Sequence, residues 1–368
     1  MKEALVGMVD LANVLAKPPF SIKKQEKAAL FQDVMQELTG HHYRKCDAYR
    51  KMLDVLGYQP DGANRIEGIP PIPVRLFKEY DLLSVDESQI VKTMTSSGTT
   101  GQGVSRIFLD RTTATNQTKV LAKIVSSVTG KKRLPMLIVD SHAVIKDRNM
   151  FSARGAGILG FSMLGRDLTY ALDEDMRLDI EKVEAFLERN ENEKVLVFGF
   201  TFIIWEKLHK YLLQAGYRLP LEDSVVIHGG GWKKLGAEAV DDRAFKRSLK
   251  DTCGISEVYN YYGMVEQTGS IFMECEAGYL HASIFSDILI RDPQTFRVLG
   301  CGEEGLIQLV SVLPLSYPGH SILTEDLGEV VGEDDCSCGW LGKYFVVRGR
   351  LANAEIRGCS DTYAAATE

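Results

Sequence analysis

The stretch Thr95-Ser-Ser-Gly-Thr-Thr-Gly-Gln-Gly103 is built almost wholly from threonine, serine and glycine, and only Gln102 departs from that pattern. Ile90–Thr93 before it and Val104–Leu109 after it both have the composition of β-strands. A loop with so little side chain, held between two strands, can bring backbone N–H groups and hydroxyls against an anion, and phosphate is the usual one. No lysine closes the stretch, so it is not the GxxxxGK(S/T) loop of P-loop NTPases. A polar hairpin connection explains the same residues about equally well.

The overall composition is that of an ordinary soluble globular protein. The chain has 368 residues, of which 45% are hydrophobic and 25% are charged. A net charge of −7, with no basic stripe, argues against a general nucleic-acid binder. No apolar run is long enough to span a bilayer, and the N-terminus lacks a signal peptide, so we expect a cytoplasmic protein without a membrane partner. Seven unevenly spaced cysteines argue against a disulfide framework.

Hydrophobic periodicity divides the chain into four segments. Residues 1–68 are predicted to be helical, with one helix around Glu26–Leu38 and a second from Tyr43 to Leu56. The first helix should bury one face, formed by Leu30, Phe31, Val34, Met35 and Leu38. Residues 69–270 alternate strands and helices, which predicts an α/β core with a largely parallel sheet. Residues 271–350 are β-rich, as in a small barrel or an antiparallel sheet, and residues 351–368 form a short tail.

Two further stretches lie at strand ends, where ligands bind in α/β folds. In His228-Gly-Gly-Gly-Trp-Lys233, three glycines allow a flat ring to lie against bare backbone, although a strand-to-helix turn explains them at least as well. Tyr259-Asn-Tyr-Tyr-Gly-Met-Val-Glu266 ends in a glutamate soon after a strand and a glycine turn. Its carboxylate suits Mg²⁺, a hard cation that prefers oxygen ligands, whereas an isolated glutamate is more often exposed.

Two more stretches lie in the β-rich segment and beyond it. In Leu323-Thr-Glu-Asp-Leu-Gly328, Asp326 is suited to accept hydrogen bonds from two ribose hydroxyls, and a β-turn acid before Gly328 is the alternative. Val347-Arg-Gly-Arg350 offers a cation that can reach a ribose or a phosphate. Cys359 follows, nine residues from the end of the chain.

Taken in order, these stretches resemble the adenylate-forming superfamily of acyl-CoA synthetases. Within it the chain looks most like the LuxE-type acyl-protein synthetases, and next like the phenylacetate–CoA ligases. The resemblance runs from Ile69-Pro-Pro-Ile-Pro-Val-Arg-Leu-Phe-Lys78 to Ala354-Glu-Ile-Arg-Gly-Cys-Ser-Asp361. It implies the α/β large domain of adenylate-forming enzymes, with mixed and parallel sheets flanked by helices, a β-rich subdomain and a truncated C-terminal lid domain.

The resemblance also implies roles for individual residues. The Ser/Thr/Gly loop would cradle the ATP phosphates, the glycine-rich strand end would pack on adenine, Glu266 would hold Mg²⁺, and Asp326 with Arg350 would bind ribose. The implied ATP-binding residues are Ser96, Ser97, Gly98, Thr99, Thr100, Gly101, Gly229, Gly230, Gly231, Tyr262, Asp326 and Arg350. Phe200, His228 and Met264 are predicted to face the acid, with core packing as the alternative for Phe200 and orientation of the turn for His228.

The tail departs from the pattern of ordinary CoA ligases. Those enzymes continue past the Gly-Arg hinge into a further domain of on the order of 100 residues that carries a catalytic lysine. Here 18 residues follow Arg350, and no lysine follows Lys343. In the acyl-protein synthetases a cysteine near the C-terminus takes the acyl group as a thioester, and Cys359 occupies that place. Arg357 nearby favours the thiolate, and an idle thiol on a frayed tail is the alternative.

A second constellation of cysteines predicts a metal site. Cys336 and Cys338 lie near the end of the β-rich segment, and Cys275 and His281 lie upstream in it. Together they would make a closed tetrahedral Zn²⁺ site of structural type. A pair of buried thiols and an unrelated surface histidine is the alternative. The remaining cysteines of the folded region, Cys46, Cys253 and Cys301, are expected to be packing residues.

The resemblance implies an ATP-dependent acyl-protein synthetase, an AMP-forming acid–thiol ligase. It would activate a carboxylic acid, of the fatty-acid class, as acyl-AMP with release of pyrophosphate, and load the acyl group onto Cys359 for a partner reductase or acyltransferase. Cys359, Glu266 and Arg350 would be catalytic, with ATP and Mg²⁺ required. Two alternatives stay open, namely a ligase of the phenylacetate–CoA ligase type that passes the acyl group to CoA or a carrier protein, and a non-catalytic nucleotide-binding or scaffold subunit.

Overall fold

The computed structural model describes residues 11–60, 65–96, 104–145, 153–232 and 238–351. They form two compact units. The first unit takes the described residues within Met1–Thr95, Gly103–Ile124 and Gly263–Glu355, and the second takes those within Ser96–Gln102 and Val125–Tyr262. The predicted division of the chain at residues 68, 270 and 350 stays a prediction.

An antiparallel sheet organises the first unit. Its strands lie in the order β11-β12-β13-β14-β10-β9, each neighbouring pair is antiparallel, and β1 joins β13 in parallel. The strands are β1 (Ile72–Pro73), β9 (Phe272–Glu274), β10 (Leu280–His281), β11 (Ser286–Arg291), β12 (Gly305–Ser311), β13 (Ser321–Glu333) and β14 (Lys343–Arg350). Every residue of β11 and β12 is buried, which places the core of this unit around these two strands. Of the two arrangements expected for residues 271–350, the antiparallel sheet is the one observed.

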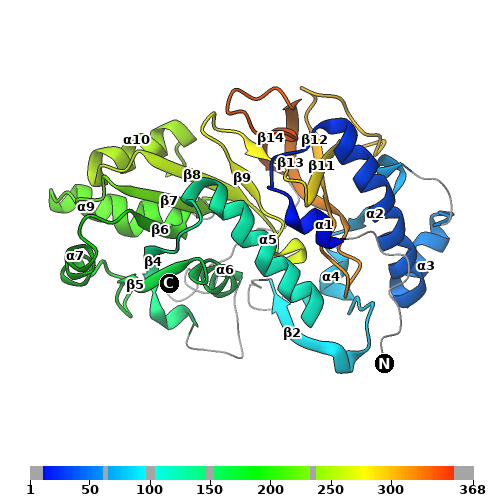
Figure 1. Cartoon of the computed structure of the whole chain (residues 1–368), viewed down its shortest axis with the longest axis horizontal. Coiled ribbons are helices and arrows are strands. Elements are labelled where there is room, and N and C mark those ends of the chain that lie inside the picture. Colours follow the sequence, from blue (N-terminus) through cyan, green and yellow to red (C-terminus); the bar gives the residue numbers. More distant parts are fainter. Residues whose placement is uncertain (1–10, 61–64, 97–103, 146–152, 233–237, 352–368) are drawn as a thin grey trace. The chain divides into compact units, whose positions relative to one another are not determined.

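Helices and a separate hairpin complete the first unit. They are α1 (Leu11–Ala16), α2 (Lys24–Lys45), α3 (Asp47–Val55), α4 (Leu76–Glu79) and α5 (Arg111–Thr129), the short turns η1 (Ile66–Gly68), η2 (Glu87–Gln89) and η6 (Val265–Gln267), and the strand pair β2 (Ile90–Thr95) and β3 (Arg106–Asp110). Figure 1 shows α2, in dark blue, beside the strands of the sheet. The helix face that carries Phe31, Met35 and Leu38 is fully buried, whereas Leu30 is only half-buried.

The second predicted helix begins later than expected. Helix α2 continues through Tyr43 to Lys45, and the chain then turns at Cys46, whose backbone is extended (φ −117°, ψ 104°). Helix α3 starts only at Asp47. The break has a tertiary cause, because the side chain of Cys46 is buried and the residues before it continue the buried face of α2.

A parallel sheet organises the second unit. Its strands lie in the order β8-β7-β6-β4-β5, namely β8 (Glu257–Tyr262), β7 (Ser224–Gly229), β6 (Val195–Phe200), β4 (Leu134–Ser141) and β5 (Gly165–Leu172). The helical segments are η3 (His142–Ile145), α6 (Ala153–Ser162), α7 (Ile180–Arg189), α8 (Thr201–Ile203), the π-helical turn η4 (Ile204–His209), α9 (Lys210–Ala215) and α10 (Asp242–Cys253). Strand β4 lies between β5 and β6, so the direction of the crossovers reverses there, as it does at the ligand-binding edge of doubly wound sheets.

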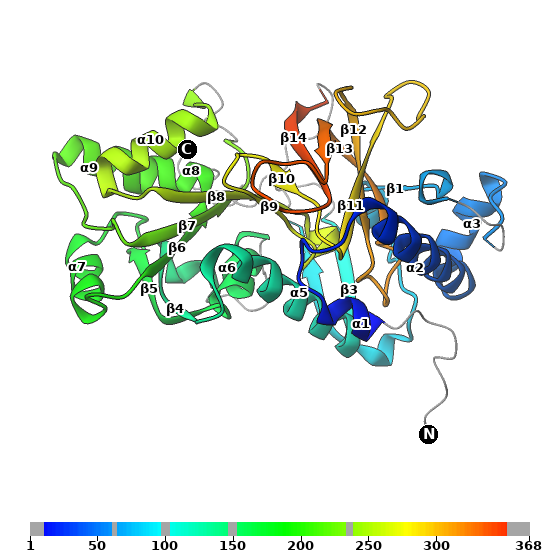
Figure 2. The ribbon, with the colours of Figure 1, turned by 45° about the horizontal axis from the view of Figure 1, so that its top comes forward.

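The two faces of this parallel sheet are covered by different helices. Figure 2 shows α10 and α6 on opposite sides of it. Phe161 of α6 stacks on Phe198 of β6 with ring centroids 4.3 Å apart, while the next strand residue, Gly199, contacts Ile204 of η4. Side chains alternate between the faces of a strand, and right-handed crossovers that reverse direction place helices on both sides. The predicted α/β architecture with a parallel sheet is thus observed.

Two stacked histidines are buried where α2 packs in the first unit. The rings of His42 and His320 lie 4.8 Å apart, and both side chains are fully buried. His42 Nε2 donates to the carbonyl oxygen of Pro314 (3.1 Å), so its Nδ1 accepts from the Ser84 hydroxyl (2.8 Å). Burial, and then the charge of neighbouring histidines, lowers the pKa of His42 well below 6.5 and that of His320 to about 3. Both rings are therefore neutral in the folded protein.

This pair predicts a loss of stability in mild acid. The folded-state pKa values lie below the unfolded value, so the stabilisation is complete above about pH 6.5 and falls as the pH drops. Between pH 6 and pH 5, each histidine should reduce the free energy of unfolding by about 1.4 kcal/mol per pH unit. Denaturant unfolding at pH 7, 6 and 5 measures this slope. His42→Gln should reduce the slope, and equal slopes in the two proteins would contradict the prediction.

Candidate active site

The strands that flank the Ser/Thr/Gly loop form the predicted hairpin. β2 and β3 pair antiparallel, and their last register pair is Thr95 with Arg106. Ser96 follows β2 directly. The other predicted phosphate-binding residues of this loop, Ser97, Gly98, Thr99, Thr100 and Gly101, lie outside the described residues. The strands on either side of the loop are thus paired, as both interpretations of its sequence require.

The glycine-rich end of β7 lies against an aromatic ring of the protein itself. A Cβ added to Gly229 would lie 2.5 Å from Cε1 of Tyr261, so only glycine leaves room for that ring. Gly230 has φ +79°, a conformation that disfavours other residues. Gly230 and Gly231 are exposed, and Tyr262, one residue after Tyr261 on β8, is half-buried and directed to the opposite face of the strand. The binding of adenine by Gly229, Gly230, Gly231 and Tyr262 stays a prediction.

The side chains of His228 and Phe200 lie on opposite faces of the parallel sheet. His228 pairs in register with Gly199, whereas Phe200 pairs with Gly229. His228 is covered by Phe245 of α10, with ring centroids 4.6 Å apart. Phe200 packs towards α6, where a Cβ added to Gly157 would lie 3.2 Å from its Cζ. A substrate pocket on one face of the sheet therefore cannot receive both side chains in this arrangement.

His228 is held as a neutral ring that orients the end of β7. The Thr201 hydroxyl donates to the carbonyl oxygen of Gly229 (3.1 Å), so it accepts from Nδ1 of His228 (2.9 Å). Burial, followed by the charge of Lys246, lowers the pKa of His228 to about 3. Of the two roles considered from the sequence, this geometry favours orientation of the turn over contact with a carboxylate.

Glu266 is buried in a turn that is fixed from several sides. It lies in η6, and its side chain is 2% exposed, so the interpretation as an exposed glutamate is wrong. Its backbone oxygen accepts from the Tyr317 hydroxyl (2.9 Å). The next residue, Gln267, donates to the backbone oxygens of Gly319 (2.8 Å) and Leu309 (3.2 Å). Burial and then the Glu266 charge raise the pKa of Tyr317, so that hydroxyl keeps its proton.

The predicted Mg²⁺ and substrate residues are neighbours in sequence here. Met264 precedes η6 in extended conformation and is half-buried, two positions before Glu266. A carboxylate held in a fixed, buried turn has the donor chemistry that a hard divalent cation needs. Its assignment as the Mg²⁺ ligand stays a prediction.

Asp326 and Arg350, two predicted ribose-binding residues, are brought together. They form a register pair between β13 and β14, and Arg350 Nε donates to Asp326 Oδ1 (3.1 Å). Asp326 lies inside the long strand β13, not in a β-turn, so the alternative of a turn acid is wrong. Thr324 fixes the backbone of Asp326, because the Thr324 hydroxyl accepts from the Asp326 backbone N–H (3.1 Å) and donates to the backbone oxygen of Ile307 (2.8 Å).

Sequence reasoning missed a buried ion pair at the carboxyl end of β4. Arg154 of α6 makes two hydrogen bonds to the Asp140 carboxylate, at 2.7 and 2.5 Å, and both side chains are at least nine-tenths buried. Burial raises the pKa of Asp140, and the bonds and charge of Arg154 oppose that change. The available signal was an aspartate closing an otherwise apolar strand, Met136–Asp140, at the point where the sheet order reverses.

The four predicted zinc ligands come together in the first unit. The ligand atoms of Cys275, His281, Cys336 and Cys338 all lie within 4.8 Å of one another. The alternative of an unrelated surface histidine is therefore wrong, since His281 is fully buried among these thiols.

Other cysteine predictions have mixed outcomes. Cys46 and Cys253 are buried as expected, but Cys301 is exposed in the turn that begins at Gly300, so its interpretation as a packing residue is wrong. Cys359 lies outside the described residues. Among the residues that the structure describes, no helix is both long and apolar enough to cross a membrane.

Solved structures with this fold are adenylate-forming ligases. The chain superposes on a 2-hydroxyisobutyryl-CoA ligase in an open conformation with 2-HIB-AMP and CoA, with a TM-score of 0.69 and 14% identity over 90% of this chain and 77% of that one. The same ligase in its postadenylation state with R3-HIB-AMP gives 0.68 and 15%, over 90% and 69%. The predicted α/β fold, with a mixed sheet flanked by helices, is confirmed.

Sequence relatives narrow this class to one family. The chain is 23% identical to the long-chain-fatty-acid–luciferin-component ligase of Vibrio harveyi, over 91% of this chain and 88% of that protein. It is 26% identical to the phenylacetate-coenzyme A ligase of Thermus thermophilus, over 87% and 69%. The family model for acyl-protein synthetase, LuxE, matches residues 2–367, so the chain belongs to the LuxE acyl-protein synthetase family. The predicted enzyme class, a ligase, is confirmed.

Proposed function

We propose that this ligase activates a carboxylic acid of the fatty-acid class as acyl-AMP and transfers the acyl group to its own Cys359. The observation that carries the proposal is the family match, which covers residues 2–367 and therefore includes Cys359. The name of the Vibrio harveyi relative supports a long-chain fatty acid as the substrate. The buried turn that holds Glu266 and the bonded pair of Asp326 and Arg350 support a reaction with ATP in which these residues act.

In the first half-reaction, a carboxylate oxygen of the acid attacks the α-phosphorus of ATP. The new P–O bond forms as the bond to the β-phosphate breaks, and pyrophosphate leaves. Arg350, bonded to Asp326 across β13 and β14, would offer a fixed cation and a carboxylate to ribose hydroxyls and phosphate oxygens. Mg²⁺ held by Glu266 would offset charge on the phosphates. The Ser/Thr/Gly loop would supply hydroxyl and N–H donors to the same oxygens.

In the second half-reaction, the Cys359 thiolate attacks the acyl carbon of acyl-AMP. A C–S bond forms, the C–O bond to phosphate breaks, and AMP leaves. Cysteine is suited to this step because a thiolate is the most nucleophilic side chain near neutral pH. The thioester keeps the acyl group activated for a partner reductase or acyltransferase, which then takes it by attack on the same carbon.

Intact-mass measurement tests the covalent step. Incubation with ATP, Mg²⁺ and a panel of fatty acids should add the mass of the acid minus one water, and hydroxylamine should remove it. Cys359→Ser should form no adduct while keeping carboxylate-dependent pyrophosphate exchange, because only the acceptor is lost. Cys301→Ser, a change at an exposed cysteine, should acylate normally. An adduct that survives Cys359→Ser, or none on the unaltered enzyme, would sink the proposal.

Transfer to CoA is the second candidate, and the Thermus thermophilus relative favours it through its name as a coenzyme A ligase. In that case acyl-AMP reacts with the CoA thiol, and Cys359 is not an intermediate. The two functions differ in one measurement. Acyl-CoA formation at an undiminished rate by Cys359→Ser would establish the CoA ligase activity, whereas its absence together with a self-acylated unaltered enzyme supports transfer to Cys359.

A further inference from the structure

Two distances within the cluster of Cys275, His281, Cys336 and Cys338 match those of an occupied zinc site. Tetrahedral zinc with Zn–S bonds of about 2.3 Å and Zn–N bonds of about 2.0–2.1 Å separates two sulfurs by about 3.8 Å, and sulfur from nitrogen by about 3.5 Å. The observed separations are 3.9 Å between the sulfurs of Cys275 and Cys336, and 3.5 Å between Cys338 Sγ and His281 Nε2. All three cysteines are free thiols.

Two tight turns present these ligands. Cys275 opens the turn between β9 and β10, where the N–H of Gly278 donates to its carbonyl oxygen (2.9 Å). Cys336 opens the turn between β13 and β14 in the same way, with the N–H of Gly339 donating to its oxygen (3.0 Å). The backbone N–H of Trp340 donates to Cys338 Sγ (3.3 Å), the kind of outer bond that orients a metal-bound sulfur. Four protein ligands leave no open position, so the site is structural.

The chain segment that leads into the first turn of α2 is docked on the second of these turns. We call residues 19–27 the docking segment. The Phe20 ring stacks on Trp340, with centroids 4.0 Å apart and planes 7° from parallel, and its edge faces His281. The N–H of Leu341 donates to the oxygen of Phe20 (3.3 Å). Trp340 therefore binds both a zinc ligand, through its backbone, and the docking segment, through its ring.

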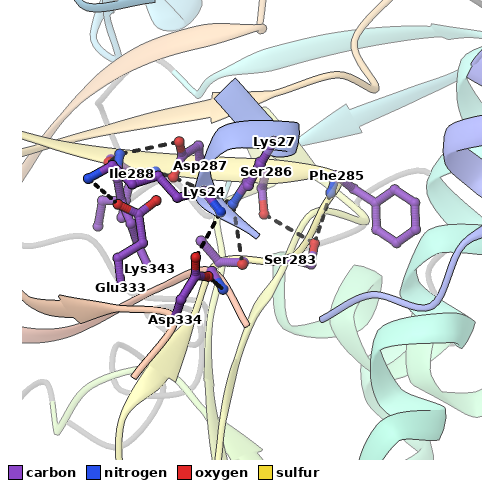
Figure 3. A network of polar contacts seen from close by, with 12 residues as sticks. Lys24, Lys27, Ser283, Phe285, Ser286, Asp287, Ile288, Glu333, Asp334 and Lys343 are labelled. Carbon is purple, nitrogen blue, oxygen red and sulfur yellow. Dashed lines mark hydrogen bonds and ion pairs between the residues drawn. The ribbon is translucent and has the colours of Figure 1, made fainter. Parts of the chain in front are cut away.

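Polar bonds extend this attachment into the start of α2. The backbone N–H of Lys24 donates to Asp334 Oδ2 (2.8 Å), and the other oxygen of Asp334 accepts from the N–H of Gly342 (2.8 Å). Figure 3 shows Asp334 and Glu333 meeting Lys24 from the end of β13. Asp334 and Gly342 bracket the turn that holds Cys336 and Cys338, so a change in that turn moves the carboxylate that holds Lys24.

Further along the docking segment, Lys27 forms a buried ion pair with Asp287. Lys27 is 2% exposed, and its Nζ lies 3.6 Å from Asp287 Oδ1. Lys343, the first residue after the metal turn, binds the other oxygen of Asp287 (3.2 Å) and the backbone oxygen of Ile288 (2.9 Å). A buried carboxylate between two ammonium groups is stable only while all three are in place, because an unpaired buried charge is strongly unfavourable. The docking of Lys27 thus depends on the position of Lys343, which follows the turn between β13 and β14.

We propose that these four residues bind one Zn²⁺, and that the bound ion holds the docking segment, residues 19–27, on the first unit. Binding releases the protons of the three thiols and fixes both turns in the geometry that receives Phe20 and Lys24. Loss of zinc frees the turn that holds Cys336 and Cys338, and the docking segment then separates together with its ring, backbone and charge contacts.

Metal analysis and limited trypsin digestion of the full chain test both parts. About one zinc per chain should copurify. Chelation should make cleavage after Lys23 and Lys24 at least about tenfold faster, because cleavage follows local opening. Cleavage after Arg166 in the second unit should keep its rate, and added Zn²⁺ should restore protection, so the result does not depend on a variant that folds.

Variants then separate the ion from the docking contact. Cys338→Ser should lose zinc and protection together, and Cys301→Ser should keep both. Phe20→Ala should keep zinc but lose protection, since it removes only the ring that stacks on Trp340. A chain without bound metal, or one whose cleavage at these lysines is unchanged when zinc is removed, would overturn the proposal.

Discussion

Replacing Glu266 with glutamine is expected to reduce carboxylate-dependent pyrophosphate exchange by about 10²–10³-fold, the usual effect of removing one group that stabilises charge on the reacting atoms. Glutamine fills the same buried space. The bonds that fix the turn, from the Tyr317 hydroxyl to the Glu266 backbone oxygen and from the Gln267 side chain to the Gly319 oxygen, do not involve the altered atoms. The change therefore removes a negative charge with little change of shape. Exchange of labelled pyrophosphate into ATP, with the acid present and absent, measures the effect.

A matched control uses another glutamate of the chain. Glu257, in β8, forms a partly exposed ion pair with Lys194 (2.6 Å), and Glu257→Gln should leave exchange within about twofold of the unaltered enzyme. Raising the Mg²⁺ concentration should recover part of the activity of Glu266→Gln, because a weakened metal site is filled by mass action. Normal exchange in Glu266→Gln would remove this residue from the proposed metal site.

The largest effect on stability is expected from Arg154→Met. This change leaves the Asp140 carboxylate buried without its partner, and breaking such a pair destabilises the folded state by about 3–5 kcal/mol. An unpaired buried carboxyl has a raised pKa, so the folded variant gains relative stability when Asp140 is protonated. The deficit should therefore shrink as the pH falls from 7 towards 5. Urea unfolding at both pH values measures it.

Two further variants isolate the cause. Arg166→Met removes an arginine of the same unit from an exposed pair with Glu193, and should lower the unfolding free energy by only about 0–1 kcal/mol. The double change Asp140→Leu with Arg154→Met removes both charges, and should recover much of the lost stability. If Arg154→Met were no less stable than Arg166→Met, the buried pair would not have the role given to it.

Local patterns were sufficient to predict most strands and helices of the second unit. Apolar runs such as Lys194–Gly199 have the length of buried parallel strands, and Gly216 marks a helix end with φ +61°. The pattern failed at β5 and α6. Strand β5 carries charged residues, including Arg166, and α6 is rich in glycine, so neither has a clear apolar period. Their positions are set by packing against β4 and β6.

The candidate site was predictable in its residue types and less so in its environments. Asp326 and Arg350 were predicted separately, and their pairing depends on the register of β13 with β14, which local sequence does not encode. Lys27 looks like an exposed lysine of an amphipathic helix, because its partner Asp287 lies far along the chain. For His228 two roles were considered, and local sequence does not show that its ring packs against Phe245, 4.6 Å away.

The register of Arg350 also bears on the second half-reaction. Nine residues separate it from Cys359, and nine residues span at most about 32 Å when fully extended. A thiol confined within that radius of a fixed point has an effective concentration on the order of 10 mM. A soluble thiol must be present at comparable concentration to compete on equal terms. Because β13 fixes the strand that ends at Arg350, the anchoring of that strand would set the kinetic advantage of Cys359 over free acceptors in the proposed second half-reaction.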